Sequence, residues 1–405
     1  MSGSILIVAG EASGDLHGSN LIKALKEIDP ALRFYGVGGE KMKGVGFSAI
    51  EDSKNLAVVG ISEVILKLGR LYAAFNKLKK ALDENRPDIV VLIDFPDFNL
   101  HVAKEADKRG IPVIYYIGPQ VWAWRRRRVK KIARLVDKML VVFPFEEDIY
   151  KKAGMDVEYV GHPLAGIVSC RLSKEDALSS LSMGHGRVVA LLPGSRRHEV
   201  ERLLPVMLEA AAIIKREIKD IQFILPLADT IEQTFIEEII KNSQSLLTTC
   251  RDRFEIAIVR GRLYEVLRAS DAAIVASGTA TLETALMEVP MVIIYKVSIL
   301  TSIIGRMFVR VDYIGLPNIV AGKWIVPELI QENARPELIA KDILKFLGNR
   351  DTRNSVISEL KEMGKKLGSG DASKKAAEEI YSFLKSQESG LPLQAVGREV
   401  RSQKL

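Results

Sequence analysis

The sequence has very few cysteines and no long uninterrupted run of apolar residues. Only Cys170 and Cys250 occur among 405 residues. They match no metal-binding spacing, so the pair is typical of a protein from a reducing compartment. No uncharged apolar run approaches the roughly 20 residues that a membrane-spanning helix needs. Because a strand-like run follows Met1 within a few residues, we expect no signal peptide. These absences argue against a disulfide-rich secreted domain and a helical membrane protein.

Several nucleotide and metal motifs are also missing. Neither Gly-x-x-x-x-Gly-Lys nor Gly-x-Gly-x-x-Gly occurs, so we expect no P-loop and no nicotinamide or flavin dinucleotide. No Asp-x-Asp occurs, and no two of the five histidines have the spacing His-x-x-x-His. The sequence therefore predicts no protein-bound metal centre and no cofactor, and leaves room only for a loosely held Mg²⁺.

The composition that is present is that of an ordinary globular protein with a basic balance. A chain of 405 residues is long for one domain and natural for two. Hydrophobic residues make up 47% and charged residues 27% of the chain, which provides ample core. The net charge of +7 indicates an anionic partner: a nucleotide, a lipid surface or a nucleic acid.

Short apolar runs alternate with helical patterns along both halves of the chain. This alternation predicts an α/β fold with two Rossmann-like parallel-sheet domains facing each other across a cleft. We expect an N-terminal domain over residues 1–165, a C-terminal domain over residues 166–385, and a poorly ordered tail over residues 386–405. Ligands of such sheets bind beyond the carboxyl ends of the strands, so we expect the site in the cleft.

Two strand–turn–helix segments in the C-terminal half have the character of phosphate sites. In the first, the apolar run 272–276 leads into Ser277, Gly278 and Thr279 and then a helical pattern. Free backbone N–H groups and the helix dipole favour an anion at such a turn. Glu283 lies about one helical turn further and can accept hydrogen bonds from a sugar or ribose. A capped helix without a ligand explains this segment equally well.

The second segment repeats the arrangement and adds arginine. The apolar run 188–192 leads into Pro193, Gly194 and Ser195, followed by Arg196. The guanidinium group offers a rigid fork of donors that matches phosphate geometry. The two segments together predict a diphosphate site.

The N-terminal half offers carboxylates at two strand ends. Asp94 ends the apolar run 89–93 and Asp97 follows in the next loop, where a carboxylate can take a proton from an attacking hydroxyl. We assign the general base to Asp97, with Asp94 and Glu11 as alternatives; the competing interpretation is that Asp97 only caps a helix. Ser13 and Asp15 share the first strand–helix turn with Glu11, and a helix cap explains those two equally well.

A basic stretch suits an anionic lipid or a sugar phosphate, with a solvated helix face that binds no partner as the alternative, and an apolar helical stripe lies in the same half of the chain. Tryptophans 122 and 124 precede four consecutive arginines, 125–128. The pattern 61–82 places an apolar stripe beside cations, and we expect its later turns to pack on the sheet. Its early turns are typical of an interfacial helix. If the chain takes lipid substrates from a bilayer, the residues that we expect at the membrane are Lys67, Leu68, Arg70, Leu71, Tyr72, Arg125 and Arg126.

The motifs in combination resemble the lipid A disaccharide synthases, inverting glycosyltransferases of family 19 with the GT-B architecture. The matching pieces are Ala9–Asp15, Ile93–Asn99, Pro119–Trp124, Leu191–Arg196, Ala276–Glu283 and Leu316–Asn318. They keep this order over about residues 4–385.

The resemblance implies transfer from UDP-2,3-diacylglucosamine to 2,3-diacylglucosamine 1-phosphate. The products are a β-1,6-linked disaccharide 1-phosphate and UDP. It also implies a metal-independent reaction, a homodimer, and peripheral attachment to the cytoplasmic face of the inner membrane. The residues expected to contact the donor substrate are then Gly194, Ser195, Arg196, Ser277, Gly278, Thr279, Glu283 and Asn318. Those expected to contact the acceptor substrate are Glu11, Ser13 and Asp15.

Two other functions compete with this interpretation. A UDP-N-acetylglucosamine 2-epimerase or another soluble GT-B enzyme shares the donor half, but turns over unacylated UDP-sugar. A non-catalytic nucleotide- or RNA-binding protein uses the arginine run but has no need of Asp97; no RNA-binding motif accompanies that run.

Overall fold

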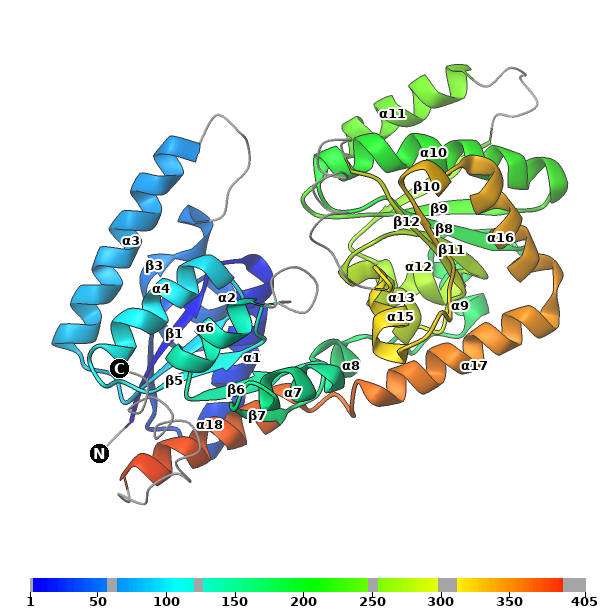
Figure 1. Ribbon diagram of the computed structural model, residues 1–405. Helices are drawn as coiled ribbons and strands as arrows, with labels where there is room; N and C mark the ends of the chain where they lie inside the picture. The colour runs from blue at the N-terminus through cyan, green and yellow to red at the C-terminus, as the bar shows by residue number, and fades with distance from the viewer. Residues whose placement is uncertain (1–2, 57–63, 120–126, 247–253, 298–311, 389–405) are drawn as a thin grey trace. The chain divides into compact units, whose positions relative to one another are not determined.

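The computed structural model describes residues 3–56, 64–119, 127–246, 254–297 and 312–388 (Figure 1). The chain forms two compact units. Unit 1 consists of Met1–Gly166 and Leu367–Leu405, and unit 2 of Ile167–Lys366. Both are α/β units built on a parallel sheet, as the alternating pattern predicts.

Unit 1 contains a seven-stranded parallel sheet with the order β3-β2-β1-β4-β5-β6-β7. Its strands are β1 (Ser4–Ala9), β2 (Arg33–Gly38), β3 (Phe47–Asp52), β4 (Ile89–Ile93), β5 (Val113–Tyr116), β6 (Lys138–Val141) and β7 (Asp156–Tyr159). Its helices are α1 (Ala12–Ile28), α2 (Glu40–Lys43), η1 (Ser53–Asn55), α3 (Val64–Glu84), α4 (Pro96–Asp107), α6 (Arg127–Leu135), α7 (Pro144–Lys151), α8 (Leu164–Ile167, which ends at the unit boundary) and α18 (Ala372–Glu388).

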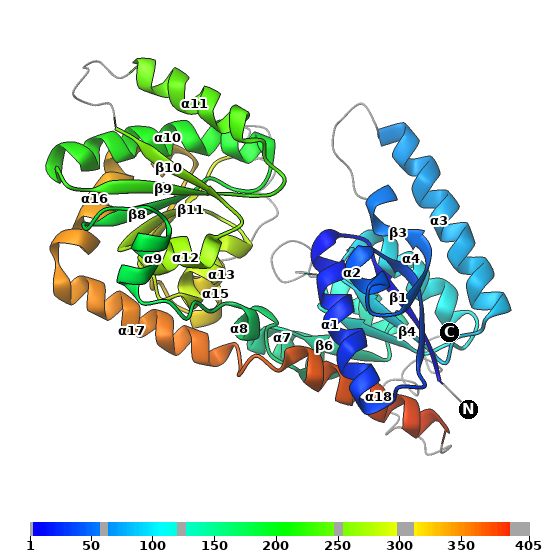
Figure 2. The same cartoon turned by 180° about the vertical axis from the view of Figure 1, so that it is seen from behind.

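The central strands of this sheet are buried on both faces. Every residue of β1 and β4 is buried, because α3, α4 and α6 cover one face and α1 with α18 the other (Figures 1 and 2). Continuous apolar runs such as Ile89–Ile93 suit that position. The strand order reverses between β1 and β4, so the segments that follow these two strands meet at a topological switch point.

Unit 2 contains a six-stranded parallel sheet with the order β10-β9-β8-β11-β12-β13. Its strands are β8 (Val188–Leu192), β9 (Gln222–Leu227), β10 (Ile256–Arg260), β11 (Ala272–Ala276), β12 (Met291–Tyr295) and β13 (Glu328–Ile330). Its helices are α9 (Lys174–Ser180), α10 (Arg197–Glu217), α11 (Gln233–Leu246), α12 (Leu263–Ala269), α13 (Thr279–Leu286), α15 (Leu316–Ala321), η4 (Gln331–Asn333), α16 (Pro336–Gly348) and α17 (Arg350–Lys366).

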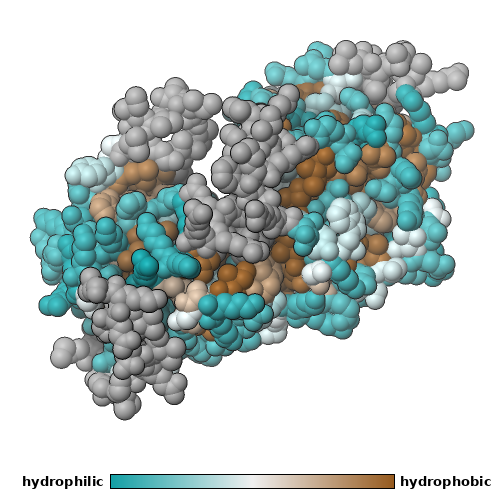
Figure 3. All heavy atoms as spheres, viewed as in Figure 1, coloured by the Kyte–Doolittle hydropathy of each residue, from teal (hydrophilic) through white to brown (hydrophobic). Residues whose placement is uncertain are grey.

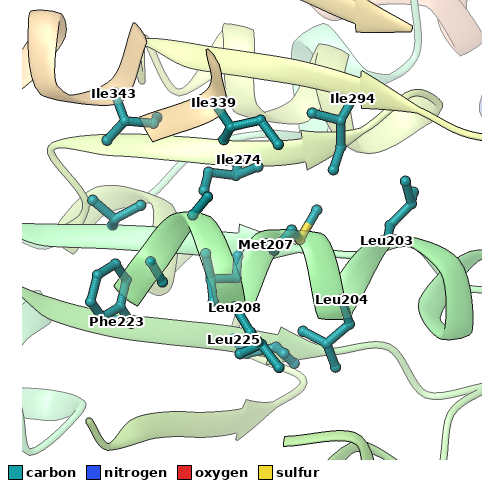
Figure 4. Packing of buried hydrophobic residues seen from close by; sticks show 14 of the residues in the cluster. Leu203, Leu204, Met207, Leu208, Phe223, Leu225, Ile274, Ile294, Ile339 and Ile343 are labelled. Atoms are coloured by element: carbon teal, nitrogen blue, oxygen red, sulfur yellow. The ribbon is translucent and has the colours of Figure 1, made fainter. Parts of the chain in front are cut away.

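The core of unit 2 lies between its sheet and the helices α10 and α16. Leu204 and Met207 of α10 and Ile339 of α16 are buried beside Ile274 and Ile294 of the sheet (Figure 4). The sheet's switch point lies between β8 and β11, whose carboxyl ends carry the two predicted phosphate turns.

Two expected boundaries differ from the structure. We expected residues 166–385 to form one domain, but α18 packs on α1 and belongs to unit 1. Its apolar face explains this, since Ala376, Ala377 and Ile380 are fully buried. Residues 386–388, expected in the tail, belong to α18, which continues to Glu388; residues 389–405 lie outside the described part.

Two strands have no clear signal in the sequence. Edge strand β3 is only partly buried and lacks an apolar run, and β13 has three residues. Near the start of unit 2, α9 begins after Ser173, whose hydroxyl accepts the Asp176 N–H at 3.0 Å. This helix packs against α12 inside unit 2.

Among the described helices, none is both long and apolar enough to span a bilayer. On the face drawn in Figure 3, the surface of the described residues is largely hydrophilic, with smaller hydrophobic areas.

Candidate active site

Unit 2 has a pocket of about 560 Å³ at the carboxyl ends of β8, β9, β10 and β11. The seven predicted donor residues that line it are Gly194, Ser195, Arg196, Ser277, Gly278, Thr279 and Glu283. Both predicted phosphate turns therefore border one cavity, because their strands are neighbours in the sheet. Such a switch-point crevice is where open α/β sheets bind ligands.

The turn after β8 requires glycine and presents an arginine. Gly194 has φ +113°, and a Cβ there would lie 2.5 Å from Glu199 Oε2. Arg196 precedes the first residue of α10, and its Nη1 is 3.0 Å from Glu199 Oε1. The Arg196 side chain is 71% exposed, so it is free to turn toward a ligand. By contrast, Arg197 stacks on the Phe235 ring at 3.8 Å.

The turn after β11 supplies small donors at the start of a helix. Gly278 precedes α13, which begins at Thr279. The Ser277 N–H donates to Ile294 O at 3.0 Å, which fixes the turn to the neighbouring strand β12. The hydroxyl-bearing residues Ser277 and Thr279 line the pocket beside the helix start, where the dipole favours negative charge.

Glu283 has a partner that the sequence analysis missed. The Tyr264 hydroxyl lies 3.1 Å from Glu283 Oε1, and both residues line the pocket. Burial raises the pKa of Glu283, while the Tyr264 hydrogen bond acts in the opposite direction. Tyr264 follows the carboxyl end of β10 and the glycine at 261. A search of every strand end, rather than two of them, would have found it.

Asn318 is placed differently from the other predicted donor residues. Its side chain is fully buried. Its Nδ2 donates to Val326 O at 2.9 Å and Glu328 Oε1 at 2.8 Å, and its Oδ1 accepts two backbone N–H groups. All its hydrogen-bonding capacity holds the α15–β13 region together. The structure therefore gives Asn318 a supporting role and does not place it on the pocket wall.

The acceptor residues predicted on the first turn also divide into two kinds. Glu11 and Ser13 are exposed at the start of α1, and Glu11 makes no cap hydrogen bond. Asp15 is buried, and its carboxylate accepts the backbone N–H groups of Gly39, Lys41 and Met42 at 2.7–3.1 Å. Asp15 thus caps α2, which neither of our interpretations included.

The two candidate bases lie in contrasting environments. Asp97 is in the first turn of α4, its side chain is 78% exposed, and it is paired with Arg128 of α6. Asp94 is half-buried directly after β4, close enough to Glu11 to feel its charge. Burial, followed by the negative charge of Glu11, raises the pKa of Asp94 to about 6.

The predicted membrane residues are only partly described. Arg125 and Arg126 lie outside the described residues, as do the side chains of Lys67 and Leu68. Arg70 and Tyr72 of α3 are exposed, Tyr72 by 68%, whereas Leu71 packs against the core of unit 1. In the later turns Ala74, Leu78 and Leu82 are buried, which confirms the expectation that those turns pack on the sheet.

No cluster of three or more His, Cys, Asp or Glu side chains that could hold a metal ion occurs within the described ranges.

Relatives and solved structures agree on the family and on the fold. The family model described as lipid-A-disaccharide synthetase matches residues 5–380. The lipid-A-disaccharide synthase of Syntrophus aciditrophicus (strain SB) is 48% identical over 385 residues, which cover 95% of this chain and 98% of that protein. The Geobacter metallireducens enzyme of the same name is 48% identical over 381 residues, with 94% and 97% covered.

The similar solved structures are more distant. The UDP-GlcNAc 2-epimerase from Neisseria meningitidis has a TM-score of 0.63 at 11% identity, covering 94% of this chain and 100% of that one. MurG from Acinetobacter baumannii has a TM-score of 0.57 at 12% identity, with the same coverage. At these identities the similarity shows the fold alone, so it does not support the alternative that the chain is an epimerase. The chain belongs to the lipid-A-disaccharide synthetase family of GT-B glycosyltransferases.

Proposed function

We propose that the chain transfers diacylglucosamine from UDP-2,3-diacylglucosamine to the 6-hydroxyl of 2,3-diacylglucosamine 1-phosphate. The products are the β-1,6-linked disaccharide 1-phosphate and UDP. Given the family, the observation that best supports this proposal is the switch-point pocket of unit 2, which both predicted phosphate turns and Glu283 line. In this proposal unit 2 binds the donor, and unit 1 supplies the acceptor contacts and the base.

The pocket offers each part of UDP a matching group. Backbone N–H groups at the starts of α10 and α13 and the guanidinium of Arg196 suit the diphosphate. Glu283, held by Tyr264, accepts hydrogen bonds from the ribose hydroxyls. As the glycosidic bond breaks, negative charge grows on the departing UDP, and these fixed donors stabilise it. Arg196 provides the largest single charge among them.

The general base that fits best is Asp94 rather than our first choice, Asp97. A base works well when its pKa is near the working pH and its carboxylate is not neutralised by a partner. Asp94 has a pKa of about 6, whereas Asp97 is ion-paired with Arg128. In the reaction the acceptor oxygen bonds to the anomeric carbon, the bond from that carbon to UDP breaks, and the hydroxyl proton passes to the base.

Incubating the chain with the two lipid substrates and measuring UDP and disaccharide tests the function. We expect equal amounts of both products. Release of UDP without disaccharide, or turnover of unacylated UDP-N-acetylglucosamine to its 2-epimer, would contradict the proposal.

Matched isosteric variants test the base. Asp94→Asn should lower kcat by about 10² or more, while UDP affinity stays near wild type. Asp97→Asn should lower kcat less, since the wild-type carboxylate is engaged with Arg128. In the wild type kcat should rise with pH through about 6, because the base must be deprotonated. A large loss in Asp97→Asn with near-normal Asp94→Asn would restore Asp97 as the base.

The lipid substrates lead to a further part of the proposal, attachment to the cytoplasmic face of the inner membrane. Support comes from α3, where Tyr72 and Arg70 are both exposed on a helix whose later turns are buried. An exposed aromatic beside a cation suits a membrane interface with anionic lipids. We include in the proposal that the enzyme is a homodimer, which light scattering of the purified chain can test.

A further inference from the structure

The turn between β4 and α4 has an uncommon backbone conformation. Asp94 has φ +48° and Phe95 has φ +47°, so two consecutive non-glycine residues adopt the left-handed region. Residues with a Cβ rarely adopt the left-handed region, because the Cβ comes too close to the backbone there. Such strain persists only where the surroundings impose the conformation, and it is often found at functional sites.

Two buried side chains converge on the Asp94 carbonyl and impose this conformation. Asn99 Nδ2 donates to Asp94 O at 2.7 Å, and the Tyr115 hydroxyl donates to the same oxygen at 2.6 Å. Asn99 and Tyr115 are both fully buried. Asn99 Nδ2 also lies 3.2 Å from Ile93 O, so it holds the end of β4. If the turn relaxed, the Tyr115 hydroxyl would lose its acceptor and Asn99 Nδ2 would lose its shortest hydrogen bond.

The opposite side of the turn is held by packing. The Phe95 ring lies where a Cβ of Gly10 would be, 2.3 Å from that position. Gly10 therefore lets the ring close over the end of β1, and Asp94 N–H completes the clamp with a 3.1 Å bond to Ile117 O. The carbonyl of Asp94 is thus turned toward the core, and the Asp94 carboxylate remains at the carboxyl end of β4 near Glu11.

We propose that Asn99 and Tyr115 are positioning residues for the reaction: by holding the Asp94 carbonyl they keep the Asp94 carboxylate at the acceptor side of the site. The inference rests on the proposed role of Asp94 as base. Neither residue touches substrate in this scheme. Their effect is on where the carboxylate lies and how far it is removed from water.

The charged and titratable groups around the β4–α4 turn come from α1, β5, α4 and α6. Glu11 lies at the start of α1 and raises the pKa of Asp94, and Tyr115 comes from β5. Asp97, from α4, is neutralised by Arg128 of α6. If the turn relaxes, the Asp94 carboxylate gains water, and its pKa should fall from about 6 toward the ordinary aspartate value.

The test compares two neighbouring buried tyrosines in the full-length enzyme. Tyr115→Phe removes the hydroxyl that reaches Asp94 O. Tyr116→Phe, one residue further on the same strand, removes an equally buried hydroxyl that lies beside Ser373 on the opposite side of the sheet. We would measure kcat from pH 5 to 8 with both lipid substrates, and the Kd of UDP by calorimetry.

For Tyr115→Phe we expect kcat to fall about tenfold and the acid limb to move about one pH unit lower, with the Kd of UDP within about twofold of wild type. For Tyr116→Phe we expect no change in kcat or in the limb. Asn99→Leu should have the same effects as Tyr115→Phe. If Asn99→Leu fails to fold, the result for Tyr115→Phe alone tests the positioning role.

Asp94→Asn separates the two proposals. If Asp94→Asn turns over normally, the proposed base is wrong. If Asp94→Asn is inactive but Tyr115→Phe keeps the wild-type kcat and limb, the positioning role is wrong. Equal losses in Tyr115→Phe and Tyr116→Phe would also overturn it, since they would indicate a general effect on stability.

Discussion

Replacing Arg196 with alanine tests the donor site most directly, because the neighbouring residue provides a matched control. Arg196 lines the pocket, whereas Arg197 stacks on Phe235 at 3.8 Å and pairs with Glu201 at 3.3 Å. The two side chains are similarly exposed, at 71% and 66%. Arg196→Ala and Arg197→Ala therefore remove the same charge from the same helix start, but only one removes it from the pocket.

The expected magnitude follows from the type of bond and its exposure. A hydrogen bond to a charged group contributes about 1.5–3 kcal/mol, or about 10- to 150-fold in Kd. Because Arg196 is largely exposed, solvent screening favours the lower end of this range. Its loss also leaves Glu199, now unpaired, beside the bound diphosphate. We expect the Kd of UDP to rise about tenfold in Arg196→Ala and less than about twofold in Arg197→Ala.

Isothermal calorimetry with UDP at fixed ionic strength measures both values, and thermal unfolding checks that both variants fold. A second titration with acceptor lipid should show no difference between the variants. The assignment is wrong if Arg196→Ala binds UDP as tightly as the wild type, or if both variants weaken equally.

Three further predictions concern the surface, acid stability and one buried carboxylate. Tyr72→Ser should reduce binding to anionic vesicles about fivefold, since roughly 1 kcal/mol of apolar burial is lost. Trp324→Ser, which changes another exposed aromatic residue, should leave vesicle binding unchanged. Co-sedimentation with vesicles measures both variants, and an equal loss in both would refute the role of α3. Burial lowers the pKa of His162 to about 3. Below about pH 6.5 the unfolded chain therefore binds a proton at this residue that the folded chain does not bind. Stability should decrease as the pH falls below about 6.5, by about 1.4 kcal/mol per pH unit from this residue. His162→Asn should remove that part of the slope in urea melts at pH 4–6 yet still accept the Leu164 N–H; an unchanged slope would contradict this. Asp271→Asn should lower the free energy of unfolding by about 2 kcal/mol, because its buried carboxylate binds Lys174 at 2.6 Å, and a change below about 0.5 kcal/mol in denaturant melts would refute it.

The sequence predicted well where one local pattern determines the structure. Buried strands such as Val188–Leu192 and Ala272–Ala276 need continuous apolar runs, and both occur at the predicted residues. The turns after them contain the small and basic residues that border the pocket. The parallel sheet brings neighbouring strand ends together, so the pocket followed from the alternation of strands and helices.

What the sequence could not predict depends on contacts between distant segments. Asp15 caps a helix that begins 25 residues later, and Asn318 bonds to the strand that follows its helix. Burial and the nearby Glu11 distinguish Asp94 from Asp97, and local spacing reveals neither. The Tyr115 hydroxyl reaches the Asp94 carbonyl from another strand. No periodicity of a single segment contains this information.

The return of α18 to unit 1 has a consequence for synthesis on the ribosome. Unit 2 is continuous in sequence, from Ile167 to Lys366, whereas unit 1 is completed only when the last described helix has been made. Until then α1 lacks the helix that packs on it, including the buried Ile380 and Phe383. The nascent first unit therefore waits, with an apolar helix face uncovered, while about 200 residues of the second unit are translated; at roughly 5–20 residues per second this takes about 10–40 seconds. A chain that stops before residue 372 would keep that face exposed permanently, which makes a premature stop in this region a cause of aggregation even when every pocket residue is present.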